Sequence, residues 1–203
     1  MQKRSGLRRP KKKRSHPGDV SVRALFLVGF MGAGKSSVGR ALGERLGWTF
    51  VDLDERIERR EGRTVAELFR TLGEQKFRRA ERAALRELLK ELQSGSAMIV
   101  ALGGGAFVQK ENAAGIKSIG VPTVFLDAPV AELWGRCQQQ RSSKQVDRPL
   151  LIDAQGFQGL YDARRPGYLK ASLRVETSGK DAAAVAAEVA RAFDLDRRKF
   201  EIA

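Results

Sequence analysis

The run Gly29-Phe30-Met31-Gly32-Ala33-Gly34-Lys35-Ser36-Ser37 contains the pattern G-x-x-x-x-G-K-S. In such a loop the backbone N–H groups cradle phosphates, the lysine adds positive charge and the serine hydroxyl can ligate Mg²⁺. The apolar residues 24–28 before it predict a buried strand, and residues 38–46 after it have helical periodicity that ends at Gly47. Phosphates would then lie at a helix N-terminus, where anions are favoured. We therefore expect a nucleotide to contact Gly32, Ala33, Gly34, Lys35, Ser36 and Ser37.

Length and composition indicate one ordinary globular domain. The chain has 203 residues, of which 31% are charged and 42% hydrophobic. We expect no membrane helix, since no apolar run approaches the ~20 residues needed, and no secretory signal peptide. Cys137 is the only cysteine, which excludes an internal disulfide and favours the cytoplasm. His16 is the only histidine, which excludes a histidine base and a His/Cys zinc site.

Positive charge is concentrated at the N-terminus. Residues 1–23 contain nine Lys or Arg and one acid, and thus carry +8 of the net charge of +14. We expect residues 1–21 to form a disordered basic extension, because they lack apolar periodicity. This extension could contact nucleic acid or an acidic partner. We favour a solvated extension without a specific role, since a charge run alone is weak evidence.

The remainder of the chain alternates predicted strands and helices. Strands are predicted at 49–52, 98–102, 123–126 and 173–176, the last one at an edge. Helices are predicted at 54–60, from a capping box at 64–67, at 74–92, from 130 and at 181–193. The polar segment 138–147 is predicted to be a mobile loop. Such alternation indicates a parallel sheet covered by helices on both faces, which is a three-layer α/β/α arrangement.

Two aspartates follow the second strand, at the sheet edge where ligands bind in such folds. Asp52 could hold Mg²⁺ through water, and Asp54 could accept the proton of an attacking hydroxyl. The alternative is a helix-capping aspartate with an exposed neighbour. Two acids beside a phosphate loop favour the functional interpretation.

Several further groups are candidate ligand contacts. Arg78 can bind a carboxylate through two bonds, although periodicity alone favours an exposed ion pair with Glu81. The glycines Gly103, Gly104 and Gly105 permit close backbone approach to a ligand, or form a flexible turn. Arg148, on a lid of about 138–151, suits charge stabilisation on a transferring phosphoryl group. The pair Arg164-Arg165 could clamp an acid, but either arginine alone would be taken for surface charge.

In their order and approximate spacing, these motifs resemble the shikimate kinases. The matching series is the phosphate loop, Asp-x-Asp, Phe-Arg-x-x-Glu, Gly-Gly-Gly-Ala, Arg-Pro-Leu-Leu and Arg-x-Pro-x-Tyr. The resemblance covers residues 22–193 and leaves 194–203 as a C-terminal extension. It implies a fold of the P-loop NTPase type, with a five-stranded parallel sheet in the order 2-3-1-4-5. It also implies transfer of the ATP γ-phosphoryl group to the 3-hydroxyl of shikimate, in aromatic amino-acid biosynthesis. The segment between Arg136 and Arg148 is longer than the family pattern.

The resemblance also implies residue roles. Asp54, Phe69, Phe77, Arg78, Gly104, Gly105 and Arg164 would contact shikimate, with Arg78 and Arg164 on its carboxylate. It selects Arg164 over Arg165, because Arg164 stands four residues before Tyr168. Lys35 and Arg148 would stabilise the phosphoryl group, Ser36 and Asp52 would hold Mg²⁺, and Arg136 would stack on adenine. A monomer is implied.

Two other functions are compatible with parts of the sequence. A kinase of another hydroxy acid, such as gluconate, would explain the phosphate loop and the lid but not the later motifs. A nucleic-acid-binding protein acting through the basic extension would lack aromatic residues interleaved with the basic run.

Overall fold

The fold was analysed in a computed structural model, which describes residues 22–144 and 153–196. A five-stranded parallel sheet has the order β2-β3-β1-β4-β5. The strands are β1 (Ala24–Val28), β2 (Thr49–Asp52), β3 (Met98–Ala101), β4 (Thr123–Asp127) and β5 (Leu173–Glu176). The predicted strand segments and the order 2-3-1-4-5 are confirmed.

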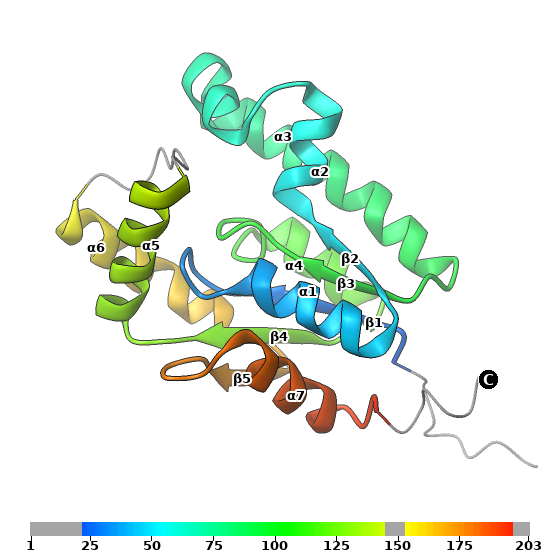
Figure 1. The fold of residues 1–203 in the computed structure, drawn as a ribbon. Coiled ribbons are helices and arrows are strands. Elements are labelled where there is room, and N and C mark those ends of the chain that lie inside the picture. The colour runs from blue at the N-terminus through cyan, green and yellow to red at the C-terminus, as the bar shows by residue number, and fades with distance from the viewer. Residues whose placement is uncertain (1–21, 145–152, 197–203) are drawn as a thin grey trace, which may run out of the picture.

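Helices cover both faces of the sheet, which confirms the three-layer prediction. They are α1 (Lys35–Leu46), α2 (Leu53–Glu61), α3 (Val65–Gln93), α4 (Lys110–Ser118), α5 (Val130–Lys144), α6 (Ala154–Tyr168) and α7 (Ala182–Ala192). In Figure 1, α1 and α7 pack side by side in front of the sheet, and α4 lies behind it. No helix in the described ranges combines the length and apolar composition that a membrane span requires.

Burial explains which segments became central strands. Every residue of β1, β3 and β4 is buried, as expected for parallel strands covered on both faces. In β5 the side chains of Arg174 and Glu176 are exposed, which fits its place at the sheet edge. Since all strands are parallel, their carboxyl ends meet at one edge, where the phosphate loop and Asp52 lie together.

The helix α3 is interrupted at Gly73. This residue has φ 76° and ψ 167°, a conformation that glycine adopts readily and other residues rarely do. Thr64 and Glu67 form the predicted capping box at the start of α3. The break divides α3 into a first part, 65–72, and a second part, 74–93, which begins where the sequence predicts the long helix.

The prediction of a loop over 138–147 is wrong for residues 138–144, because α5 continues to Lys144. No glycine or proline interrupts residues 136–148, and Gln, Arg and Lys are good helix formers. The missing apolar periodicity reflects the polar sequence of this end of α5. The rest of the predicted lid, including Arg148, lies outside the described residues. Helix α4 has no counterpart among the predicted elements, and for α6 only a helix end near Arg164 is predicted.

Candidate active site

A cavity of about 620 Å³ opens at the carboxyl edge of the sheet, between the phosphate loop and the first part of α3. Nearly all predicted phosphate and acid contacts line it. From the predicted set these are Gly32, Gly34, Lys35, Ser36, Ser37, Asp52, Asp54, Phe69, Phe77, Arg78, Gly103, Gly104, Gly105 and Arg164. Residues from five separate segments of the chain therefore share one cavity.

The phosphate loop is folded around its own lysine. The Lys35 ammonium donates hydrogen bonds to the carbonyl oxygens of Gly29 and Phe30, each at 3.0 Å. Gly34 takes a left-handed conformation, φ 87°, and α1 begins directly after it. The start of α1 thus faces the cavity, and its dipole and amide groups favour an anion there.

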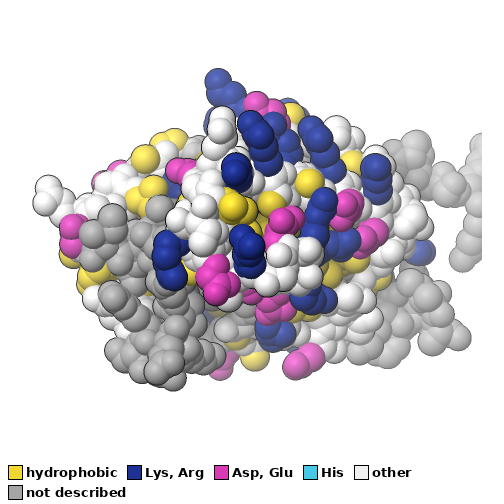
Figure 2. All heavy atoms as spheres, turned by 90° about the horizontal axis from the view of Figure 1, so that it is seen from above, with side chains coloured by type: hydrophobic (Ala, Val, Ile, Leu, Met, Phe, Trp, Pro, Cys, Tyr) yellow, Lys and Arg dark blue, Asp and Glu magenta, His cyan; other side chains and the backbone are white. Residues whose placement is uncertain are grey.

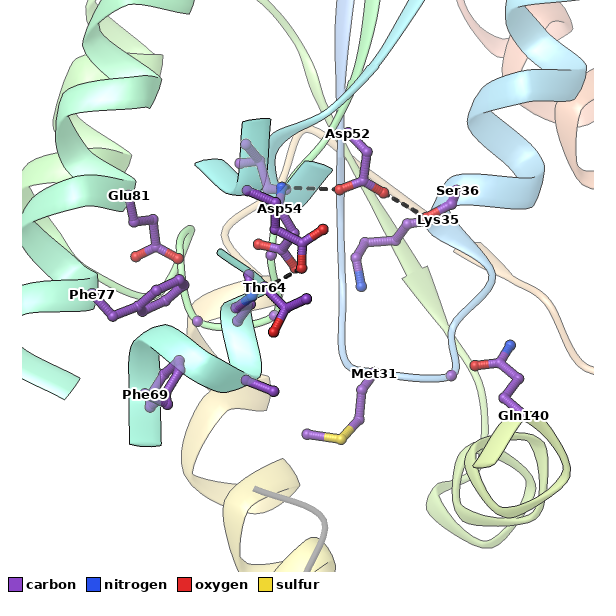
Figure 3. A pocket seen from close by; sticks show the side chains of 18 of the residues that line it. Met31, Lys35, Ser36, Asp52, Asp54, Thr64, Phe69, Phe77, Glu81 and Gln140 are labelled. Atoms are coloured by element: carbon purple, nitrogen blue, oxygen red, sulfur yellow. Dashed lines mark hydrogen bonds between the residues drawn. The ribbon is translucent and has the colours of Figure 1, made fainter. Parts of the chain in front are cut away.

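Ser36 and Asp52 form a polar pair at the same edge. The Ser36 hydroxyl donates to the Asp52 carboxylate at 2.7 Å, and the other Asp52 oxygen accepts from the Asp54 amide at 3.0 Å (Figure 3). Asp52 is therefore the N-cap of α2, as the alternative interpretation allowed, and also contacts the phosphate loop. Both side chains present oxygen atoms, the ligand type that Mg²⁺ prefers.

Asp54 lines the same cavity as Asp52. Burial raises the pKa of the Asp54 carboxyl to about 7, and repulsion from Asp52 and Glu81 adds to the increase, while Lys35 opposes it. A carboxyl group with a pKa near neutrality is suited to accept a proton at physiological pH. Gly103 makes room for this group, since a Cβ there would lie 2.6 Å from Asp54 Oδ1.

Arg78 is held rigidly rather than lying on an exposed surface. Its Nη1 donates to both Glu81 oxygens at 3.0 Å, and its Nε and Nη2 donate to Glu74 Oε1 at 3.2 and 3.1 Å. Glu81 is only 1% exposed, so the ion pair is not the solvated one that periodicity favoured. Burial raises the pKa of Glu81, and Arg78 opposes that increase. Gly105 leaves space for the guanidinium, because a Cβ there would lie 2.5 Å from Nη2.

Aromatic rings line the cavity next to Arg78. Phe69, from the first part of α3, and Phe77, from the second part, have ring centroids 4.4 Å apart. The Arg78 guanidinium carbon lies 5.2 Å from the Phe77 centroid and 5.8 Å from that of Phe69. This arrangement supplies an apolar wall beside a fixed positive charge.

The structure separates the two neighbouring arginines of α6. Arg165 donates to the buried carboxylate of Asp127 at 3.2 Å and does not line the cavity. Arg164 lines the cavity and forms no salt bridge within the described part of the chain. Burial lowers the pKa of its guanidinium, Tyr168 opposes that decrease, and the charge of Arg78 adds to it. A half-buried cation without a salt-bridge partner among the described residues favours a bound anion.

A second cavity of about 420 Å³ adjoins the first and shares Gly32, Gly34 and Ser37 with it. Arg136, the predicted adenine contact, lines this second cavity together with Ala33. Its guanidinium donates to the Gly32 carbonyl at 3.3 Å and to both oxygens of Thr177, at 3.1 and 3.0 Å. The two cavities meet at the phosphate loop, as the two substrates of a phosphoryl transfer require.

Some supporting residues were not predicted as part of the site. Gln109 donates to Glu81 at 3.1 Å, and the Tyr168 hydroxyl donates to the Gly104 carbonyl. Glu58 accepts from the Val65 amide at 2.9 Å and so fixes the start of α3 at the cavity rim. Among the described residues no cluster of three or more His, Cys, Asp or Glu could hold a metal ion. A metal here would depend on Ser36, Asp52 and the nucleotide itself.

This sheet order, with a phosphate loop and a polar acceptor cavity at one edge, defines a P-loop kinase of a small molecule. A family model described as shikimate kinase matches residues 31–194. The chain belongs to the shikimate kinase family.

Individual relatives agree with that assignment. The shikimate kinase of Geobacter metallireducens is 40% identical over 172 residues, which cover 83% of this chain and 90% of the relative. That of Persephonella marina is 36% identical over 160 residues, covering 78% and 92%. Among solved structures, the shikimate kinase of Acinetobacter baumannii in complex with shikimate has a TM-score of 0.75 and 35% identity, covering 85% of this chain and 93% of that one. A sugar kinase from Janibacter sp., at 15% identity and a TM-score of 0.56, shares the fold alone.

Proposed function

We propose that this chain transfers the γ-phosphoryl group of ATP to the 3-hydroxyl of shikimate, giving shikimate 3-phosphate and ADP. The observation that carries the proposal is the convergence of Arg78, from α3, and Arg164, from α6, on the cavity that holds Asp54. Two fixed cations beside an apolar wall suit a small ring acid, and the phosphate loop borders the same cavity. The A. baumannii relative was solved with shikimate bound.

The chain's residues divide the work of the reaction. Arg78 and Arg164 bind the carboxylate, and Phe69 and Phe77 pack against the ring. The backbone of Gly103, Gly104 and Gly105 allows the substrate to approach closely. Asp54 accepts the proton of the hydroxyl as its oxygen bonds to phosphorus and ADP leaves. Lys35 and, from the predicted lid, Arg148 stabilise charge on the transferring group.

Nucleotide binding uses the second cavity and the phosphate loop. Gly32, Ala33, Gly34 and Ser37 contact the phosphates, and Arg136 packs against the base. The Ser36 hydroxyl and the Asp52 carboxylate fit Mg²⁺, because they are neighbouring oxygen donors at the phosphates. A Mg²⁺ ion held by these two residues and the nucleotide would supply positive charge against the negative charge that develops on the transferring phosphoryl group. We further propose a cytoplasmic location, since a single cysteine that is buried suits a reducing compartment. We also propose a monomer, as the family resemblance implies.

On the face seen from above in Figure 2, Lys and Arg side chains are interspersed with Asp and Glu, which gives no specific support there for a role in nucleic-acid binding. The basic extension, 1–21, lies outside the described residues. Binding of an oligonucleotide to the full chain and to a chain starting at Gly18, over a salt series, tests that role.

The direct test of the proposed activity is ADP release by the purified chain with Mg-ATP. Shikimate should stimulate ADP release, whereas gluconate and quinate should not. Formation of shikimate 3-phosphate in equal amount to ADP would identify the product. Stimulation by gluconate instead, or none by shikimate in protein that binds ATP, would contradict the proposal.

A further inference from the structure

A buried carboxylate outside the cavity connects β4 with the helix that carries Arg164. Asp127, the last residue of β4, is only 2% exposed. Its Oδ1 accepts from the Tyr161 hydroxyl at 2.9 Å. Its Oδ2 accepts from Arg165 Nη2 at 3.2 Å and forms an ion pair with Arg174 Nε at 3.0 Å. A buried charge persists only when it is well paired, so Asp127 is a fixed point for these side chains.

Two of its partners lie on one face of α6. Tyr161 and Arg165 are four residues apart and also bond to each other at 3.1 Å. Arg164 precedes Arg165 by one residue, which turns its side chain by about 100° around the helix axis. The rotation of α6 that brings Arg165 onto Asp127 therefore also turns Arg164 toward the cavity that it lines.

The local helix is weak at this point. Pro166 lies inside α6, where it lacks the N–H that would bond to the preceding turn. Packing supplies part of the missing restraint, because the Phe30 ring contacts Phe157 and Tyr161 with centroids 4.9 and 5.5 Å apart. The ion pair of Arg165 with Asp127 restrains α6 directly before Pro166.

The backbone of Asp127 contacts a residue of the second cavity, which we assign to the nucleotide. Its carbonyl oxygen accepts from the Thr177 amide at 2.8 Å and from the Thr177 hydroxyl at 3.1 Å. Thr177 in turn accepts from Arg136, which bonds to Gly32 of the phosphate loop. The side chain of Asp127 thus contacts the helix that carries Arg164, and its backbone contacts Thr177, which binds Arg136 of the nucleotide cavity.

We propose that Asp127 is a positioning residue for the acid substrate, which acts by holding Tyr161 and Arg165 so that Arg164 points into the cavity. This inference rests on the proposed role of Arg164 in binding the carboxylate. It predicts a division of effects between the two substrates. Weakening the contacts of the Asp127 side chain with α6 should reduce affinity for the acid and leave the nucleotide contacts unchanged.

A matched pair of substitutions tests it. Arg165→Ala and Arg174→Ala each remove an arginine from the same carboxylate oxygen, but Arg165 lies on α6 and Arg174 on β5. Arg165→Ala should raise KM for shikimate about tenfold, the effect of losing one charge-assisted hydrogen bond. Arg174→Ala should change KM for shikimate by no more than about twofold. KM for ATP should stay unchanged in both, and thermal melting verifies folding. Equal effects of the two substitutions would overturn the proposal.

Asp127→Asn provides a second route that keeps the backbone contacts to Thr177. It should raise KM for shikimate by about tenfold with KM for ATP unchanged. In an Arg164→Ala background neither Asp127→Asn nor Arg165→Ala should raise KM further, because their effect passes through Arg164. Additive effects would show a merely structural role and overturn the proposal.

Arg164→Ala alone distinguishes failure of the proposed acid site from failure of the proposed role of Asp127. A rise of about 100-fold in KM for shikimate supports the acid site. Unchanged KM in this variant would contradict the acid site and the role of Asp127 with it. A large rise for Arg164→Ala, with no change for Arg165→Ala or Asp127→Asn, would overturn only the role of Asp127.

Discussion

The amide of Asp54 donates to the carboxylate of Asp52 at 3.0 Å, so the proposed proton acceptor and the proposed magnesium ligand are parts of one helix cap. Because Asp52 remains beside Asp54, its negative charge disfavours ionisation of Asp54, in addition to the effect of burial. The cap thus fixes the position of Asp54 and adds to the increase in its pKa that burial causes.

The pH dependence of turnover follows from that environment. Asp54 must be ionised to accept a proton, and its pKa is raised to about 7. We expect kcat/KM for shikimate to increase with pH up to about 7 and then level off. Initial rates between about pH 5.5 and pH 8.5 at saturating Mg-ATP measure this. A profile without change through this range would contradict the assignment of Asp54.

Removing the carboxylate should lower activity and raise stability. Asp54→Asn should reduce kcat by on the order of 10²-fold or more, the contribution of a positioned base. The ordinary pKa of 3.8 is raised on folding, so ionisation costs stability as the pH rises from that value through about 7. The variant should therefore melt at a higher temperature than the parent chain at pH 8, and the difference should disappear near pH 4. Near-normal turnover in the folded variant would argue against the base.

The proposed binding of the substrate carboxylate by Arg78 and Arg164, here called the clamp, predicts that substitution of Arg78 selectively weakens binding of the acid. Arg78→Ala should raise KM for shikimate far more than KM for ATP, because the guanidinium faces only the acceptor side of the cavity. Arg78→Lys is the matched control for folding, since it keeps a positive charge beside buried Glu81 but loses the planar fork. It should also raise KM for shikimate, by about tenfold. Equal losses for both substrates would count against the clamp.

Space for Arg78 depends on Gly105. A Cβ at this position would lie 2.5 Å from Nη2 and 2.6 Å from Nη1, and Glu74 and Glu81 prevent the guanidinium from moving away freely. Gly105→Ala should raise KM for shikimate by on the order of tenfold. Gly159→Ala on α6 is the control, because a Cβ there meets nothing within 4 Å. It should keep full activity and add up to about 1 kcal/mol of stability through helix propensity. Wild-type KM in Gly105→Ala would show that the contact is not needed.

The parts of the fold that the sequence predicts are those with strong local signals. The apolar runs of β1, β3 and β4 indicate buried strands, and the capping box at Thr64 marks the start of α3. The length of α5 was missed because its polar end lacks the apolar periodicity on which the prediction relied. The order of the strands followed from family resemblance rather than from residue patterns.

The site shows the same division. The phosphate loop and Asp52 are adjacent to recognisable strand ends, so their meeting at one edge could be predicted. The partners of Arg78 could not be fully predicted, because the burial of Glu81 and the contact from Gln109 depend on tertiary packing. The distinction between Arg164 and Arg165 needed the family pattern in the sequence, and in the structure it follows from Asp127.

The break at Gly73 means that two separate helical segments line the acceptor side of the cavity. Phe69 belongs to the first part of α3, whereas Phe77 and Arg78 belong to the second, and only a glycine in a non-helical conformation joins them. A protein engineer could therefore replace residues 65–72 to admit acids of a different shape. The guanidinium anchor, which is fixed by Glu74 and Glu81 of the second part, would be retained in such a redesign.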